Sequence, residues 1–64
     1  MRVNGVVRVL PREASIAALV SELALAGKRI AVELNGTIVP RSRYADTRLA
    51  AGDRVEIVGA VGGG

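Results

Sequence analysis

The chain has 64 residues, half of them hydrophobic, and nine Lys and Arg against six Asp and Glu give it a net charge of +3. A chain of this length supports one domain that buries only about 60% of its unfolded surface, which excludes a two-lobed catalytic cleft. The sequence contains no His and no Cys, so the usual general base, the thiol nucleophile, disulfide bonds and the commonest metal ligands are missing.

The first ten residues predict a β-hairpin. Asn4-Gly5 lies between apolar segments, and an Asn-Gly pair in this setting is the strongest short-range signal for a tight hairpin turn. In the strand expected over residues 6–10, Val7 and Val9 alternate with Arg8. The alternation predicts that both valines face the core and that Arg8 faces water. The proline that follows has no N–H to donate, so it is expected to end this strand.

One amphipathic helix is predicted next. Ser15 is a suitable N-cap, because its hydroxyl can accept a hydrogen bond from a free amide of the first turn. Apolar residues then recur at i, i+3, i+4 and i+7 and form one core-facing stripe: Ile16, Leu19, Val20 and Leu23. Gly27 is expected at the C′ position that ends the helix, with Lys28 and Arg29 at the negative end of the helix dipole.

Two strands joined by a tight turn are expected after the helix. Residues 30–34 alternate between apolar and small or polar side chains, which is typical of a half-buried strand. They lead into a second turn at Asn35-Gly36, and the short apolar segment 37–39 follows it before Pro40. Both Asn-Gly pairs are assigned to turn formation alone.

The remainder of the chain predicts a loop and a last strand. Residues 41–47 show no clear periodicity and are expected to form a loop or a single helical turn, after which Leu49 enters the core. Gly52-Asp53 is expected to make a turn, and residues 54–58 alternate again as the last strand. Tyr44, the single aromatic residue, is either core filler or an isolated contact residue.

This order of elements predicts an α+β fold in which one helix covers one face of a mixed sheet. The arrangement is the β-grasp, or ubiquitin-like, roll, with four to five strands packed on one main helix. We expect residues 1–61 to form this domain and residues 62–64 to form a flexible glycine tail, because glycine loses more backbone entropy on ordering than any other residue. A mobile tail needs a rigid base, so the last strand is expected to lie centrally.

A series of short motifs resembles the ThiS family, the sulfur carriers of thiamine biosynthesis. In chain order they are residues 3–5 (Val-Asn-Gly), 31–36 (Ala-Val-Glu-Leu-Asn-Gly), 38–41 (Ile-Val-Pro-Arg), Leu49, 52–58 (Gly-Asp-Arg-Val-Glu-Ile-Val) and 60–64 (Ala-Val-Gly-Gly-Gly). No single motif is specific, and the resemblance depends on their order over essentially the whole chain. Pro40 and Arg41 recur in the family, and we favour a loop stop and a surface charge as their roles over direct recognition of a partner.

The resemblance implies that the terminal carboxylate of Gly64 is the working group. A ThiF-like adenylating enzyme would activate it with ATP, a sulfurtransferase persulfide fed by a cysteine desulfurase would supply sulfur, and a ThiG-like thiazole synthase would accept it. Gly62 and Gly63 would thread into the active sites of these partners, and Ala60 and Val61 are possible partner contacts. The protein would then be a co-substrate, not an enzyme, and would need no cofactor or metal of its own.

Three other functions keep the same fold. A MoaD-like sulfur carrier would donate to molybdopterin synthesis, and a ubiquitin-like modifier would form isopeptide bonds through Gly64. A passive ubiquitin-like binding module would keep its activity without the tail. Rescue of a thiamine-auxotrophic strain, conjugation to lysines and tolerance of tail deletion separate these alternatives.

The composition also bears on location and on other partners. The longest apolar runs are far below membrane-spanning length and no charged-then-apolar leader opens the chain, so we expect a cytoplasmic protein without a membrane partner. The basic residues form no dense run and no aromatic residues interleave with them, so we expect no nucleic-acid partner.

Overall fold

The structure is a computed structural model that describes residues 1–59. It contains five strands, one α-helix and one 3₁₀ helix: β1 (Arg2–Val3), β2 (Val6–Val7), α1 (Ile16–Glu22), β3 (Ile30–Leu34), β4 (Thr37–Val39), η1 (Arg41–Arg43) and β5 (Arg54–Gly59). The predicted stretch without periodicity therefore contains the single helical turn η1. No helix in residues 1–59 is long and apolar enough to cross a membrane.

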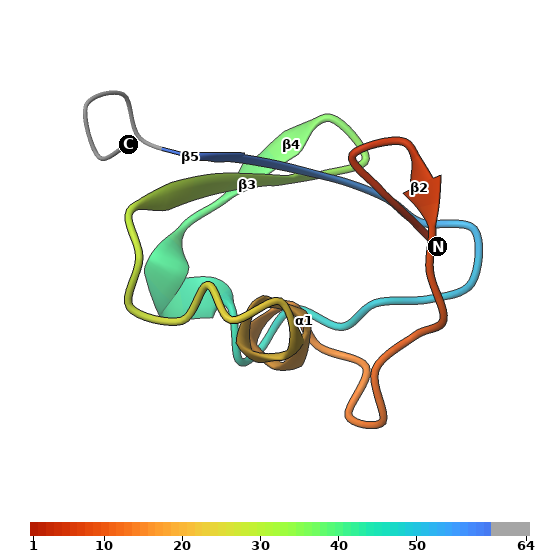
Figure 1. Ribbon diagram of the computed structural model, residues 1–64, viewed down its shortest axis with the longest axis horizontal. Helices are drawn as coiled ribbons and strands as arrows, with labels where there is room; N and C mark the ends of the chain where they lie inside the picture. Colours follow the sequence, from red (N-terminus) through yellow and green to blue (C-terminus); the bar gives the residue numbers. More distant parts are fainter. Residues whose placement is uncertain (60–64) are drawn as a thin grey trace.

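The five strands form one mixed sheet in the order β2-β1-β5-β3-β4. β5 pairs in parallel with β1 and antiparallel with β3, so the last strand of the chain lies at the centre. α1 lies across one face of the sheet, and the two layers are visible edge-on in Figure 1. The predicted β-grasp roll with a central last strand is confirmed.

The core lies between α1 and the covered face of the sheet. Ile16 and Leu19 from the helix and Val32 and Val55 from the two central strands are each at most 1% exposed. Burying a side chain of this size contributes about 1.5–3 kcal/mol. Leu49 is also buried, as predicted. These residues make the sheet and the helix a single packed unit.

The N-terminal hairpin forms at Asn4-Gly5, but its second strand differs from the prediction. β2 ends at Val7, and the side chains of Val7 and Val9 are 70% and 89% exposed, so the prediction that they face the core is wrong. The register pairs Val6 with the buried Val3, which leaves Val7 on the opposite face of the sheet. α1 covers only one face of the sheet, so Val7 on the other face stays exposed.

The start of α1 agrees with the prediction, because the Ala18 N–H donates to Ser15 Oγ at 3.1 Å. The end does not. The helix stops at Glu22, and Ala24, with φ of 60°, adopts the left-handed conformation expected of Gly27. The N–H groups of Ala24 and Leu25 donate to the carbonyls of Ser21 and Val20 at 3.0 and 2.9 Å, which is a Schellman motif.

Packing explains why the helix ends three residues early. Leu25 packs against the core, and in a Schellman motif the residue at this position contacts the residue that accepts its hydrogen bond, here the buried Val20. Gly27 forms the next turn, with φ of 79°. Lys28 and Arg29 consequently lie outside the last helical turn, which carries no basic residue.

Candidate functional site

The predicted reactive and threading residues, Ala60, Val61, Gly62, Gly63 and Gly64, lie outside the residues that the structure describes. The described chain ends at Gly59, the last residue of β5. In Figure 1, β5 runs through the middle of the sheet toward this end of the chain. The site is therefore built from the groups that hold β5 in place.

β5 is held unequally by its two neighbours. On one side β3 pairs with it over five positions, from Leu34 opposite Val55 to Ile30 opposite Gly59. On the other side β1 reaches only two positions, Arg54 and Val55, because the chain then turns back at Asn4. The half of β5 that precedes the tail thus has a complete strand on one side only.

Asn35 holds the first half of β5. Its Oδ1 accepts from the Arg54 N–H at 2.9 Å, and its Nδ2 donates to Asp53 Oδ1 at 3.0 Å. This donation lowers the pKa of the Asp53 carboxyl, and so does the Ala50 N–H that donates to Asp53 Oδ2 at 2.7 Å. Asp53 is therefore stabilised as a carboxylate in the turn that leads into β5.

Asn4 holds the second half. Its Oδ1 accepts from the Ile57 N–H at 2.7 Å, and its Nδ2 donates to the Ile57 carbonyl at 3.0 Å. Asn4 and Asn35 both have φ of 51° and both precede a glycine of positive φ, so both form the predicted tight turns. Their second role, binding the β5 backbone, was not predicted from the sequence. An asparagine can fill it because its side-chain amide carries a donor and an acceptor as a peptide group does, but the sequence around it does not indicate the partner.

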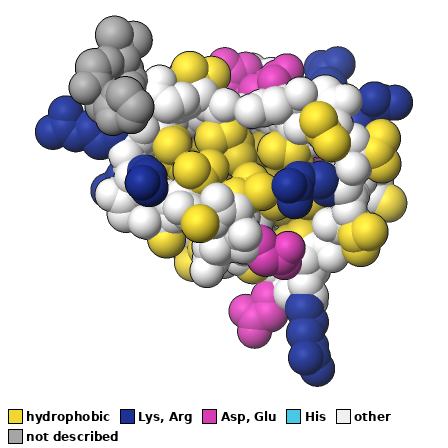
Figure 2. Space-filling model, viewed as in Figure 1, with side chains coloured by type: hydrophobic (Ala, Val, Ile, Leu, Met, Phe, Trp, Pro, Cys, Tyr) yellow, Lys and Arg dark blue, Asp and Glu magenta, His cyan; other side chains and the backbone are white. Residues whose placement is uncertain are grey.

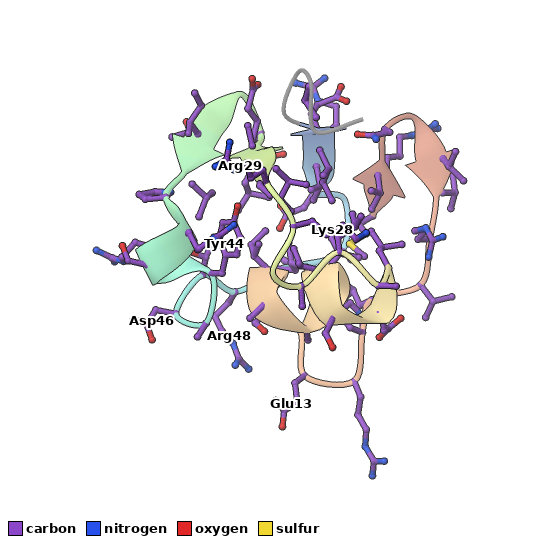
Figure 3. All side chains as sticks on the ribbon, turned by 60° about the vertical axis from the view of Figure 1, so that its left-hand side comes forward. Glu13, Lys28, Arg29, Tyr44, Asp46 and Arg48 are labelled. Atoms are coloured by element: carbon purple, nitrogen blue, oxygen red, sulfur yellow. The ribbon has the colours of Figure 1, made fainter. Side chains whose placement is uncertain are left out.

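One basic residue, Arg29, lies next to the end of the sheet at which β5 stops, and Arg41 contacts the loop before β3. Arg29 directly precedes Ile30, the partner of Gly59, and Figure 3 shows its side chain beside the start of β3. Arg41 Nη2 donates to the Lys28 carbonyl at 2.8 Å and ties η1 to the loop that precedes β3. Arg41 is exposed and Pro40 directly precedes η1.

Three charged residues of the loops lie away from β5. Figure 3 shows Glu13, Asp46 and Arg48 projecting from the loops around α1, away from the sheet. Tyr44 is 9% exposed and belongs to the core, so core filler is the correct one of its two predicted roles.

The surface between the two layers is apolar. A pocket of about 180 Å³ opens there, lined mainly by apolar residues that include Val20, Leu25 and Ile30. Figure 2 shows hydrophobic side chains gathered between the sheet and the helix, with Lys or Arg side chains beside them.

Residues 1–59 contain no group of three or more His, Cys, Asp or Glu side chains that could hold a metal ion. Every buried side-chain nitrogen and oxygen in this part of the chain has a hydrogen-bond partner. Among the described residues, no buried side-chain donor or acceptor around β5 is left without a hydrogen bond.

A five-stranded mixed sheet with one helix on one face and the last strand at its centre defines a β-grasp protein of the ubiquitin-like class. Within this class, the family model described as "ThiS family" matches residues 1–64, the whole sequence. The chain belongs to the ThiS family, the sulfur carriers of thiamine biosynthesis.

Individual relatives agree with this assignment. The structure superposes on the crystal structure of the thiamine biosynthesis protein ThiS from Geobacter metallireducens with a TM-score of 0.80 and 35% identity, covering 98% of this chain and 96% of that one. A thiazole synthase from Paramagnetospirillum magneticum is 40% identical over 62 residues, which are 97% of this chain but only 19% of the synthase. Protein ycf40 of Porphyra purpurea is 33% identical over 64 residues, which cover 90% of its length.

Proposed function

We propose that this protein carries sulfur on the carboxylate of Gly64 and donates it to a thiazole synthase. The observation that carries the proposal is the family match over residues 1–64, which includes the glycines 62–64. The composition agrees with it. A chain without His or Cys has no side chain suited to hold sulfur, whereas a terminal carboxylate can do so as a thiocarboxylate.

The proposed cycle begins with activation, because a carboxylate is an unreactive acyl donor. A Gly64 carboxylate oxygen attacks the α-phosphorus of ATP on a ThiF-like enzyme, pyrophosphate leaves, and an acyl-adenylate forms. A persulfide sulfur of a sulfurtransferase, supplied by a cysteine desulfurase, then attacks the acyl carbon and AMP leaves. A thiol cleaves the resulting acyl disulfide and releases the thiocarboxylate of Gly64.

Glycines at 62 and 63 suit this chemistry because they lack Cβ atoms. A chain of glycines can enter a channel too narrow for side chains, and its last carboxylate is unhindered. We propose that Gly62 and Gly63 thread into the partner active sites, while Ala60 and Val61 contact the partner at the channel entrance. The carrier itself acts as a co-substrate, both when its carboxylate is activated and when its sulfur is donated.

The proposed sulfur acceptor is a ThiG-like thiazole synthase. Support comes from the thiazole synthase of P. magneticum, a protein about five times longer, which contains a segment 40% identical to this chain. A carrier module within a synthase chain is expected if the two act in succession.

Intact-mass measurement tests the proposal. The purified chain is incubated with ATP, a ThiF-like enzyme and a persulfide donor. We expect a mass gain equal to the replacement of one oxygen by sulfur, dependent on ATP. Chains that lack Gly64, or that carry one extra residue after it, should fold normally and gain no mass. Sulfur loading of either variant would contradict the assignment of Gly64.

Genetic rescue separates the sulfur acceptors. The chain should restore growth without thiamine to a strain that lacks its own thiamine sulfur carrier. Rescue of a strain defective only in molybdopterin synthesis would instead support the MoaD-like alternative. Conjugates of the chain on lysines of other proteins, without a thiocarboxylate, would support a ubiquitin-like modifier.

A further inference from the structure

The side chain of Asn4 continues a strand that the main chain has left. In the β1–β5 ladder the Arg2 N–H donates to the Asp53 carbonyl and the Asn4 N–H to the Val55 carbonyl, each at 2.9 Å. The next position of β5 in this series is Ile57. No backbone group of β1 reaches it, because the chain turns toward β2 at Asn4-Gly5.

On its β1 side, Ile57 has no strand to pair with, because β1 pairs only with Arg54 and Val55; β3 lies on the other side, with Val32 opposite Ile57. Backbone groups of successive strand residues point to opposite sides, so the C=O group of Asp53 and the N–H and C=O groups of Val55 and Ile57 face β1. The two bonds from Asn4, 2.7 Å to the Ile57 N–H and 3.0 Å to its carbonyl, occupy both groups. They join residues 53 positions apart in the sequence.

The turn alone does not require an asparagine here. A two-residue hairpin turn needs positive φ at its central positions, and glycine satisfies this as well as asparagine does. The side-chain amide of Asn4 is therefore not needed for the turn. It binds the second half of β5 on the side where β1 has ended.

The position of Ile57 gives this contact a consequence for the tail. Ile57 lies two residues before Gly59, where the described part of β5 ends. Five residues follow it in the sequence and span at most about 17 Å when fully extended. A tilt of about 10° at the base would displace the far end of such a span by about 3 Å.

We propose that Asn4 is a positioning residue for the reactions at Gly64: it fixes the C-terminal half of β5, so that the tail leaves the domain in the direction that partner active sites accept. This inference rests on the proposed sulfur-carrier function. Asn4 touches no reacting atom. Its contribution is preorganisation, which lowers the entropy that must be lost when a partner enzyme binds the tail.

The chain offers a matched control in Asn35. It has the same φ, also precedes a glycine and also binds the β5 backbone, but at Arg54, the end remote from the tail. Asn4→Gly and Asn35→Gly therefore both keep a Gly-Gly turn. Asn4→Gly removes two side-chain bonds to the Ile57 backbone, and Asn35→Gly removes one to the Arg54 N–H and one to the Asp53 carboxylate. Asn4→Asp is a milder variant, because its carboxylate can accept from the Ile57 N–H but cannot donate to the carbonyl.

The experiment measures ATP–pyrophosphate exchange by a ThiF-like enzyme against the concentration of the intact 64-residue carrier, with amide exchange of Ile57 followed by NMR. For Asn4→Gly we expect faster exchange of the Ile57 amide and a KM for the carrier raised about fivefold or more, with kcat within about twofold of wild type. Asn35→Gly should keep both KM and the Ile57 amide close to wild type. If Asn4→Gly does not fold, Asn4→Asp carries the same test.

Two results would overturn the inference. Equal KM values for the Asn4 and Asn35 variants would show that the tail base needs no fixing at Ile57, even if the Ile57 amide exchanges faster. Failure of the wild-type chain to support exchange at all would remove the proposed function and this role with it. Because wild type is measured first, the two failures are distinguishable.

Discussion

Replacing Ala24 by glycine should stabilise the protein. Ala24 holds φ of 60° at the end of α1, a conformation that costs a residue with a Cβ about 1–2 kcal/mol. Glycine removes this cost but gains backbone freedom in the unfolded chain, which offsets about 0.4–1 kcal/mol. The net expectation is a gain of about 0.5–1 kcal/mol in the free energy of unfolding. In a domain of this size that raises Tm by about 2–8 °C.

Urea denaturation followed by circular dichroism measures this gain, and Ala26→Gly is the matched control. Ala26 is also exposed and lies in the same loop, but it is not among the non-glycine residues with positive φ. Glycine at this position only raises the conformational entropy of the unfolded chain, so it should lower the free energy of unfolding by about 0.4–1 kcal/mol. The m-value should be unchanged in both variants. If Ala24→Gly destabilises the protein as much as Ala26→Gly does, Ala24 does not have the left-handed conformation.

Two further predictions concern the scaffold around β5. Ser15→Ala should lower the free energy of unfolding by about 1 kcal/mol, because it removes the acceptor for the Ala18 N–H, and Ser15→Asp should restore most of it; equal loss in both variants would contradict the cap. The lowered pKa of Asp53 means that its carboxylate contributes stability above the ordinary Asp pKa, and that this contribution is lost as pH falls through the folded-state pKa. The stability difference between wild type and Asp53→Asn in urea titrations should therefore shrink from neutral pH toward acid, and a difference that grows toward acid would refute the assignment.

Most of the fold was predictable because local signals agree with the tertiary structure. Both Asn-Gly turns, the Ser15 cap and the alternation around Val32 and Val55 each specify an element and its buried face. Their order was enough to predict the β-grasp roll with β5 at its centre.

The errors occur where tertiary context decides. The alternation shows that Val7 and Val9 share a face, but it cannot show which face of the sheet the helix covers. The covered face is the other one, and both valines are exposed. The signal for a helix end at Gly27 is overridden by the burial of Leu25, which makes Ala24 adopt the left-handed conformation. The contact between Asn4 and Ile57 joins distant parts of the chain, so no local pattern could indicate it. The assignment of Gly64 came from the family resemblance and is a proposal about residues outside the described structure.

In the proposed function sulfur is carried on Gly64, and the mass of the C-terminal peptide measures this at the residue itself. After incubation with ATP, a ThiF-like enzyme and a persulfide donor, trypsin cleavage at Arg54 releases the peptide 55–64. We expect this peptide alone to gain the mass of one sulfur in place of one oxygen, and fragmentation to place the sulfur on Gly64. An unchanged peptide 55–64, or sulfur on any other residue, would contradict it.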